Sequence, residues 1–108
     1  MSLNDLKGYR DAYQRDGYVT IEDAVTPQAL AAMREQLDLW TSESSRHGAP
    51  YGVIMDGRPR FDIEPETHGP DTPALRRITS PIEVSDDFLA VARDNAALDL
   101  LAGVMAPN

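Results

Sequence analysis

The chain has two histidines, His47 and His68, which are its best candidates for metal ligands. Asp71 follows His68 by three residues across a Gly-Pro turn, so a site of two imidazoles and one carboxylate is conceivable. Both histidines lie in polar, loop-like stretches, which favours solvated side chains over ligands. The chain has no cysteine, which excludes disulfides, thiolate metal sites and cysteine nucleophiles.

Arginine is the other residue type that could recognise a substrate. Arg60 lies in a predicted strand, and the pair Arg76-Arg77 precedes Ile78. A guanidinium can bind a carboxylate or phosphate with two parallel hydrogen bonds, so Arg60, Arg76 and Arg77 are candidate substrate-binding residues. The simpler interpretation is that they pair with the chain's own acids, because Asp and Glu number 18 against 10 for Lys and Arg.

The acidic residues show no arrangement typical of an acid/base pair. Asp86 and Asp87 fit the first turn of a helix, where negative charge is favourable. Glu64 and Glu66 flank a proline and are expected to be solvated. We therefore assign no catalytic residue and no metal ligand from sequence.

The net charge of the chain limits which classes of partner it can bind. The chain of 108 residues carries −8, which argues against nucleic acid or an anionic membrane as the main partner. No apolar run approaches the ~18 residues of a spanning helix. The N-terminus lacks a basic stretch followed by an apolar one, so no signal peptide is predicted and a cytoplasmic protein is expected.

A helix is predicted over Leu3–Arg15, with Ser2 and Asp5 at the spacing of a capping box. Gly17 should end it in a left-handed conformation. Tyr18–Glu22 then alternates apolar and polar residues, which predicts a strand at the side of a sheet.

The strongest helix signal begins at Thr26, an N-cap residue followed by Pro27 at the first helical position. Its apolar stripe consists of Leu30, Met33, Leu37 and Trp40. The serine-rich stretch Thr41–Ser45 is predicted to end the helix.

Most of the turn-forming residues lie between 46 and 73. Two short strands, Tyr51–Met55 and Arg60–Glu64, are predicted around a turn at Asp56-Gly57, with an exposed loop over Pro65–Pro73. The last third is predicted to be helical, with one helix capped by Ser85 and another over Ala96–Met105 capped by Asn95.

Four segments, in order, carry a family resemblance: Asp16-Gly17-Tyr18-Val19 with the Thr26-Pro27 helix start, Arg60-Phe61-Asp62-Ile63-Glu64, Leu75-Arg76-Arg77-Ile78, and Leu98-Asp99-Leu100-Leu101-Ala102-Gly103. Together the chain resembles the N-terminal part of the phytanoyl-CoA dioxygenase family, which are iron(II)/2-oxoglutarate oxygenases. In that family these parts precede a double-stranded β-helix, a jelly-roll (cupin-like) core. The leading helices pack on the outside of its larger sheet.

The resemblance implies Fe(II) and 2-oxoglutarate for an intact family enzyme. Its iron triad, His-x-Asp followed much later by a second His, does not occur in these 108 residues. Neither cofactor is therefore expected to bind this chain alone. The implied fold is a single α+β region over 1–108, mainly helical with a few short strands, without the catalytic core.

Two functions remain open. The first is the N-terminal portion of a phytanoyl-CoA dioxygenase-like hydroxylase, inactive alone, whose partner is the missing catalytic core or a second copy bound through an apolar helix face. The alternative is a small acidic helical module for protein interaction. A small metal-dependent enzyme using His47 and His68 is a third, weaker interpretation.

Overall fold

The computed structural model describes residues 3–105. Four α-helices, a three-stranded sheet and one 3-10 turn make up the described chain, so it is α+β and mainly helical, as predicted. In chain order the elements are α1 (Leu3–Asp16), α2 (Pro27–Ser44), β1 (Tyr51–Val53), β2 (Pro59–Ile63), β3 (Leu75–Ile78), η1 (Pro81–Glu83), α3 (Asp86–Arg93) and α4 (Ala96–Met105).

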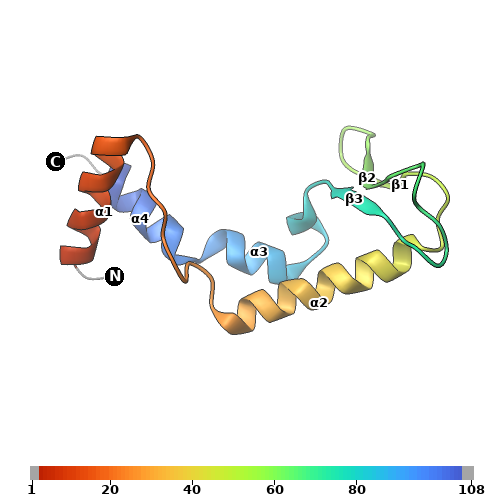
Figure 1. Cartoon of the computed structure of the whole chain (residues 1–108), viewed down its shortest axis with the longest axis horizontal. Helices are drawn as coiled ribbons and strands as arrows, with labels where there is room; N and C mark the ends of the chain where they lie inside the picture. The colour runs from red at the N-terminus through yellow and green to blue at the C-terminus, as the bar shows by residue number, and fades with distance from the viewer. Residues whose placement is uncertain (1–2, 106–108) are drawn as a thin grey trace.

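The molecule is elongated. Its extents are 52 × 29 × 24 Å and its radius of gyration is 18.3 Å, against about 13 Å for a compact domain of this length. Figure 1 shows α1 and α4 at one end and the sheet at the other, with α2 and α3 running between them. This shape leaves much apolar surface without intramolecular cover.

Helix α1 ends as the sequence predicts. Gly17 has φ +81° and donates its backbone N–H to the Tyr13 carbonyl at 2.8 Å. The helix packs against α4, where Gly103 faces Leu6 so closely that a Cβ at position 103 would lie 2.9 Å from Leu6 Cδ2. The predicted capping role of Ser2 falls outside the described residues.

The predicted strand at Tyr18–Glu22 is wrong: this segment is an irregular connection between α1 and α2. The reason is pairing, because no described strand lies alongside to accept or donate its backbone hydrogen bonds. Its burial still alternates. Val19 and Ile21 are half-buried, whereas Tyr18, Thr20 and Glu22 are exposed.

Helix α2 starts and ends where the sequence predicts. The Thr26 hydroxyl accepts the Ala29 N–H at 3.1 Å, and Pro27 occupies the first turn. The predicted end within the serine-rich stretch Thr41–Ser45 is confirmed, because the last helical residue is Ser44 and Ser45 is the C-cap. The hydroxyls of this stretch donate back to helix carbonyls: Thr41 to Leu37 at 2.9 Å, and Ser44 to Thr41 at 2.6 Å. These hydroxyls therefore find their hydrogen-bond acceptors on the helix backbone, and they do not draw the chain into a turn that would end the helix earlier.

The two predicted strands form a hairpin. Strands β1 and β2 are antiparallel, with Tyr51 opposite Phe61 and Val53 opposite Pro59. At the turn, Gly57 has φ +88°. The Asp56 carboxylate accepts the Arg58 N–H at 3.1 Å, which lowers the pKa of Asp56.

Sequence reasoning missed β3. This strand pairs antiparallel with β2, with Phe61 opposite Ile78 and Ile63 opposite Leu75, and an irregularity between Asp62 and Ile63. Only Leu75 and Ile78 of its four residues are apolar, so the segment lacks the alternation that indicates a strand.

The main core lies where the sheet meets α2 and α3. Trp40 from α2 contacts Phe61 edge-on at 5.9 Å between ring centroids, and contacts Phe88 of α3 at 5.4 Å. Ile54, after β1, and Ile63, on β2, are also buried at this end of the molecule, with 8% and 2% of their surface exposed. A smaller core around Leu100 lies at the α1–α4 end.

The C-terminal helices are capped as predicted. The Ser85 hydroxyl accepts the Phe88 N–H at 3.3 Å, and the Asn95 side chain accepts the Leu98 N–H at 3.1 Å. Helix α4 runs over the predicted Ala96–Met105. No helix within residues 3–105 is long and apolar enough to cross a membrane.

Candidate functional site

Arg60 is the most buried of the candidate substrate-binding residues, with 8% of its surface exposed. Its Nη1 donates to the carbonyls of Thr79 and Ser80 at 2.9 and 2.8 Å, and its Nη2 donates to the Glu83 carboxylate at 2.8 Å. The guanidinium thereby ties β2 to the turn that leads into α3. Three of its five N–H donors thus bind the chain's own oxygens.

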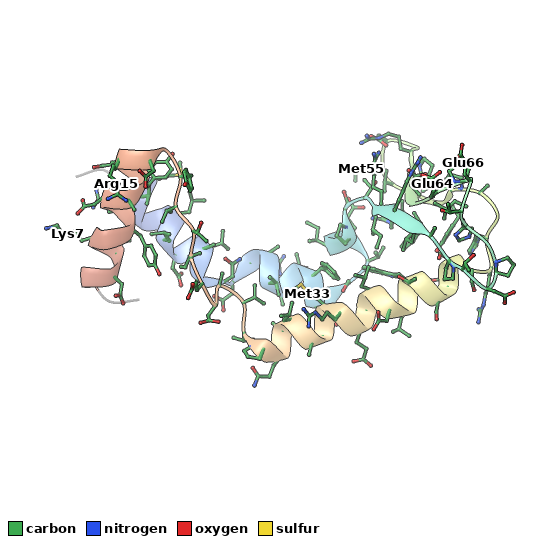
Figure 2. The ribbon with its side chains drawn as sticks, viewed as in Figure 1. Lys7, Arg15, Met33, Met55, Glu64 and Glu66 are labelled. Carbon is green, nitrogen blue, oxygen red and sulfur yellow. The ribbon has the colours of Figure 1, made fainter. Side chains whose placement is uncertain are left out.

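Arg76 lies on the exposed side of the sheet. It donates from Nε to Asp62 at 2.8 Å and from Nη1 to Glu64 at 3.0 Å. Figure 2 shows Glu64 at this end of the sheet, near Glu66. The hydrogen bond from Arg76 holds the pKa of Asp62 below its ordinary value, and the same bond raises the pKa of Arg76.

Arg77 is exposed and is the cross-strand neighbour of Asp62. Its charge adds to the lowering of the pKa of Asp62, behind the larger effect of Arg76. The three candidate arginines therefore do not converge on one pocket. Arg76 binds the Asp62 carboxylate on β2 and Arg77 acts on it only through its charge, whereas Arg60 binds oxygens at the β3–η1 end of the sheet.

The two histidines do come together. A cavity of about 240 Å³ between the end of α2 and the loop after β2 is lined by both, along with Arg46. Ala74 donates its N–H to His68 Nδ1 at 2.9 Å, so that nitrogen carries no proton. His68 Nε2 lies 2.8 Å from the His47 carbonyl and must therefore be the N–H donor. Both ring nitrogens of His68 are therefore engaged.

His47 is held by stacking. Its ring lies on Tyr51 with centroids 3.6 Å apart and planes 8° from parallel. Tyr51 in turn stacks on Phe61 at 4.8 Å. Both histidines thus have structural roles, which corrects the expectation of solvated loop side chains.

The hydrogen bonds of His68 limit metal binding in the cavity that it lines with His47. A metal could bind His68 only after a hydrogen bond that orders the loop is broken. Asp71 does not line the cavity. Among residues 3–105, no group of three or more His, Asp or Glu side chains has the placement of a metal site.

A second feature escaped the functional reading of the sequence. A cleft of about 500 Å³ lies between the end of α1, the Tyr18–Glu22 segment and α4, and none of its described lining residues is charged. Its walls include Tyr13, Ile21 and Leu101. The alternation of apolar and polar residues over 18–22 indicated one wall of this cleft. Nothing in the sequence indicated that α4 would form the opposite wall.

Comparison with known proteins gives no match: no family model, no curated protein and no solved structure corresponds to this chain.

Proposed function

We propose that this chain forms the N-terminal part of a phytanoyl-CoA dioxygenase-like Fe(II)/2-oxoglutarate hydroxylase and is inactive alone. The intact reaction would couple oxidative decarboxylation of 2-oxoglutarate to hydroxylation of a small organic or acyl substrate. The order of the four resembling segments supports the lineage.

The single observation that carries the proposal is the incomplete packing of the molecule. The radius of gyration of 18.3 Å belongs to a chain whose two ends bury separate, small cores. Large apolar side chains stay exposed along it, including Leu39 at 61%, Val53 at 73% and Met55 at 99%. Met55 projects from the β1–β2 turn (Figure 2). A set of helices and strands that packs on a larger core would have this character.

The described residues do not fit the implied iron. A facial iron site needs two imidazoles and one carboxylate with open positions beside them. Here His68 has both ring nitrogens engaged and His47 is stacked on Tyr51. In this proposal the iron and 2-oxoglutarate are held by a catalytic core, and these residues supply surface that supports it.

The reading frame after codon 108 is the direct test. The proposal expects it to continue and to encode His-x-Asp, followed much later by a second His. A stop codon directly after Asn108 in the transcript would contradict it.

A biochemical test uses the conversion of 2-oxoglutarate to succinate with Fe(II) and oxygen. The chain alone should produce no succinate above buffer, whereas the continuous protein should. Turnover by the 108-residue chain alone would refute the claim of inactivity.

The second candidate is a small acidic module for protein interaction, which the uncharged cleft beside α4 favours. An independent module should unfold in one cooperative transition as a monomer. A part that needs a larger core should instead unfold broadly or associate. Denaturation followed by two probes, with sedimentation velocity on the same sample, separates the two candidates.

A further inference from the structure

The segment Tyr18–Glu22 has the side-chain pattern of a strand but no strand partner. Its burial alternates, with Val19 and Ile21 turned to the molecule and Thr20 exposed between them. Among the described residues, no backbone N–H of Tyr18–Glu22 donates a hydrogen bond, and the segment ends in a turn at Glu22-Asp23, where Asp23 has φ +53°. A run of such free groups beside an apolar surface is a template for pairing with another extended chain.

The apolar surface is the cleft of about 500 Å³ described above. Val19 and Ile21 form part of its wall, and Leu100, Leu101 and Val104 of α4 lie across from them. A strand added beside Tyr18–Glu22 would place every second side chain toward this side of the segment, because side chains alternate along a strand. The cleft can take apolar side chains from such a strand.

The charges beside Tyr18–Glu22 indicate which kind of strand could bind there. Acidic residues stand at both ends of the segment: Asp16 before it, and Glu22 with Asp23 at its end. Asp16 is already bound by Arg15 at 2.9 Å. Glu22 and Asp23 are exposed and form no ion pair within the described chain. A binding strand with a basic residue near this end gains attraction and on-rate.

We propose that Tyr18–Glu22 is a strand-addition site that binds an extended segment of another protein, apolar at alternate positions and basic at the end that lies beside Glu22 and Asp23. A second copy of this chain fits less well. Antiparallel pairing of two copies about Thr20 would place Asp23 of one opposite Gly17 of the other, one position from Asp16, and parallel pairing in register would align Glu22 with Glu22 and Asp23 with Asp23. This site does not depend on the oxygenase lineage proposed above.

A synthetic peptide tests the proposal: acetyl-Lys-Val-Thr-Val-Thr-Val-Lys-amide, with a Glu-ended peptide of the same core and a peptide with proline at the central valine as controls. The readout is amide hydrogen exchange resolved by NMR. Neighbouring N–H groups of a strand point to opposite edges, so one added strand should protect alternate amides only. Either Val19 and Ile21, or Tyr18, Thr20 and Glu22, should become protected.

Variants of the full chain complete the test, each first checked for unchanged circular dichroism. Ile21→Thr keeps the β-branch but removes apolar contact with the cleft, and should weaken peptide binding about 10-fold. Thr20→Ala, whose side chain points away, should bind as the parent does. Glu22→Lys should remove the preference for the Lys-ended peptide over the Glu-ended one.

Three results would overturn the site. The first is no amide protection with the peptide at about 1 mM. The second is binding without the alternating pattern, which would indicate a groove ligand and not an added strand. The third is the same alternating protection without peptide, rising with protein concentration, which would identify a second copy as the occupant.

Discussion

The imidazole of His47 lies flat on the phenol of Tyr51, with ring centroids 3.6 Å apart and planes 8° from parallel. This pair begins a continuous series of ring contacts that runs through Phe61 and Trp40 to Phe88 of α3. The series joins the loop after α2, the sheet and two helices. It holds together the sheet end of an otherwise open molecule.

Tyr51→Phe tests the phenol end of that series. The Tyr51 hydroxyl is buried and has no hydrogen-bond partner among the described residues, so its removal should stabilise the fold by about 1 kcal/mol. Urea denaturation at neutral pH measures the change. Tyr51→Leu is the control, since it also removes the stacked ring and should destabilise the protein. A loss of stability in Tyr51→Phe would reveal a partner for the hydroxyl.

Tyr51 should also make the stability of the fold depend on pH in the alkaline range. Burial, and secondly the charge of Glu43, raise the pKa of Tyr51 above its ordinary value of 10.0. The folded state therefore holds this proton more tightly than the unfolded state. The contribution to stability is complete below pH 10.0 and is lost as pH rises from there to the folded-state pKa. The parent should lose more stability than Tyr51→Phe between pH 9 and 11.

Arg60→Met should destabilise the sheet end by about 3 kcal/mol. The substitution leaves the Thr79 and Ser80 carbonyls without the donor that Arg60 supplies and removes a buried side chain from the core, whereas the Glu83 carboxylate, 44% exposed, returns to solvent. Arg76→Met is the matched control. Its guanidinium is half exposed, so its loss should change the urea midpoint much less. Equal effects of the two substitutions would contradict the distinction between them.

Fe(II) should bind this chain no more tightly than a weak surface site. His68 is engaged at both ring nitrogens, by Ala74 N–H and the His47 carbonyl. Anaerobic titration calorimetry measures the affinity, and long-range 1H–15N NMR should show His68 protonated at Nε2 only. Binding at about 1 μM or tighter that disappears in His68→Ala would refute the prediction.

The helices could be predicted from the sequence because their signals are local. Thr26-Pro27 and Asn95 mark helix starts through hydrogen bonds within three residues, and Gly17 marks an end through its own φ. What failed depends on partners distant in sequence. Tyr18–Glu22 has a strand pattern but no neighbour, whereas β3 has little pattern but lies beside β2.

The candidate site was harder to predict for the same reason. The arginines and histidines could be named from sequence, but their roles could not. Arg60 is occupied by carbonyls nineteen and twenty residues away, and His68 by a carbonyl twenty-one residues away. Such contacts exist only once β2 has paired with β3 and the loop has closed on α2.

Gly17→Ala and Gly103→Ala should destabilise the chain for different reasons. At Gly17 the cost is backbone strain alone, about 1 kcal/mol, because φ is +81° and no atom lies within 4 Å of the added Cβ. At Gly103 the added Cβ meets the end of Leu6. A double-mutant cycle with Leu6→Ala therefore should show coupling for Gly103→Ala and none for Gly17→Ala. Additive energies at Gly103 would mean that α1 and α4 are not in close contact.

The apolar stripe of α2 is buried at its C-terminal end and exposed before it. Trp40 is 6% exposed within the core, whereas Leu37 on the same stripe is 43% exposed. Leu37→Glu should cost less than about 1 kcal/mol and reduce self-association, because it adds charge to a surface left open for a partner. Trp40→Ala should cost about 4 kcal/mol. Urea denaturation and sedimentation velocity measure the two effects.

The Leu37→Glu result also separates the two proposed functions. If this face of α2 packs on a larger core, the isolated chain tolerates the charge, since no described neighbour covers the side chain fully. If the chain is a self-contained module whose core includes Leu37, the same change buries an unpaired carboxylate and costs several kcal/mol. A cooperative monomeric transition in the parent that Leu37→Glu abolishes would therefore refute the N-terminal-part proposal and favour the interaction module.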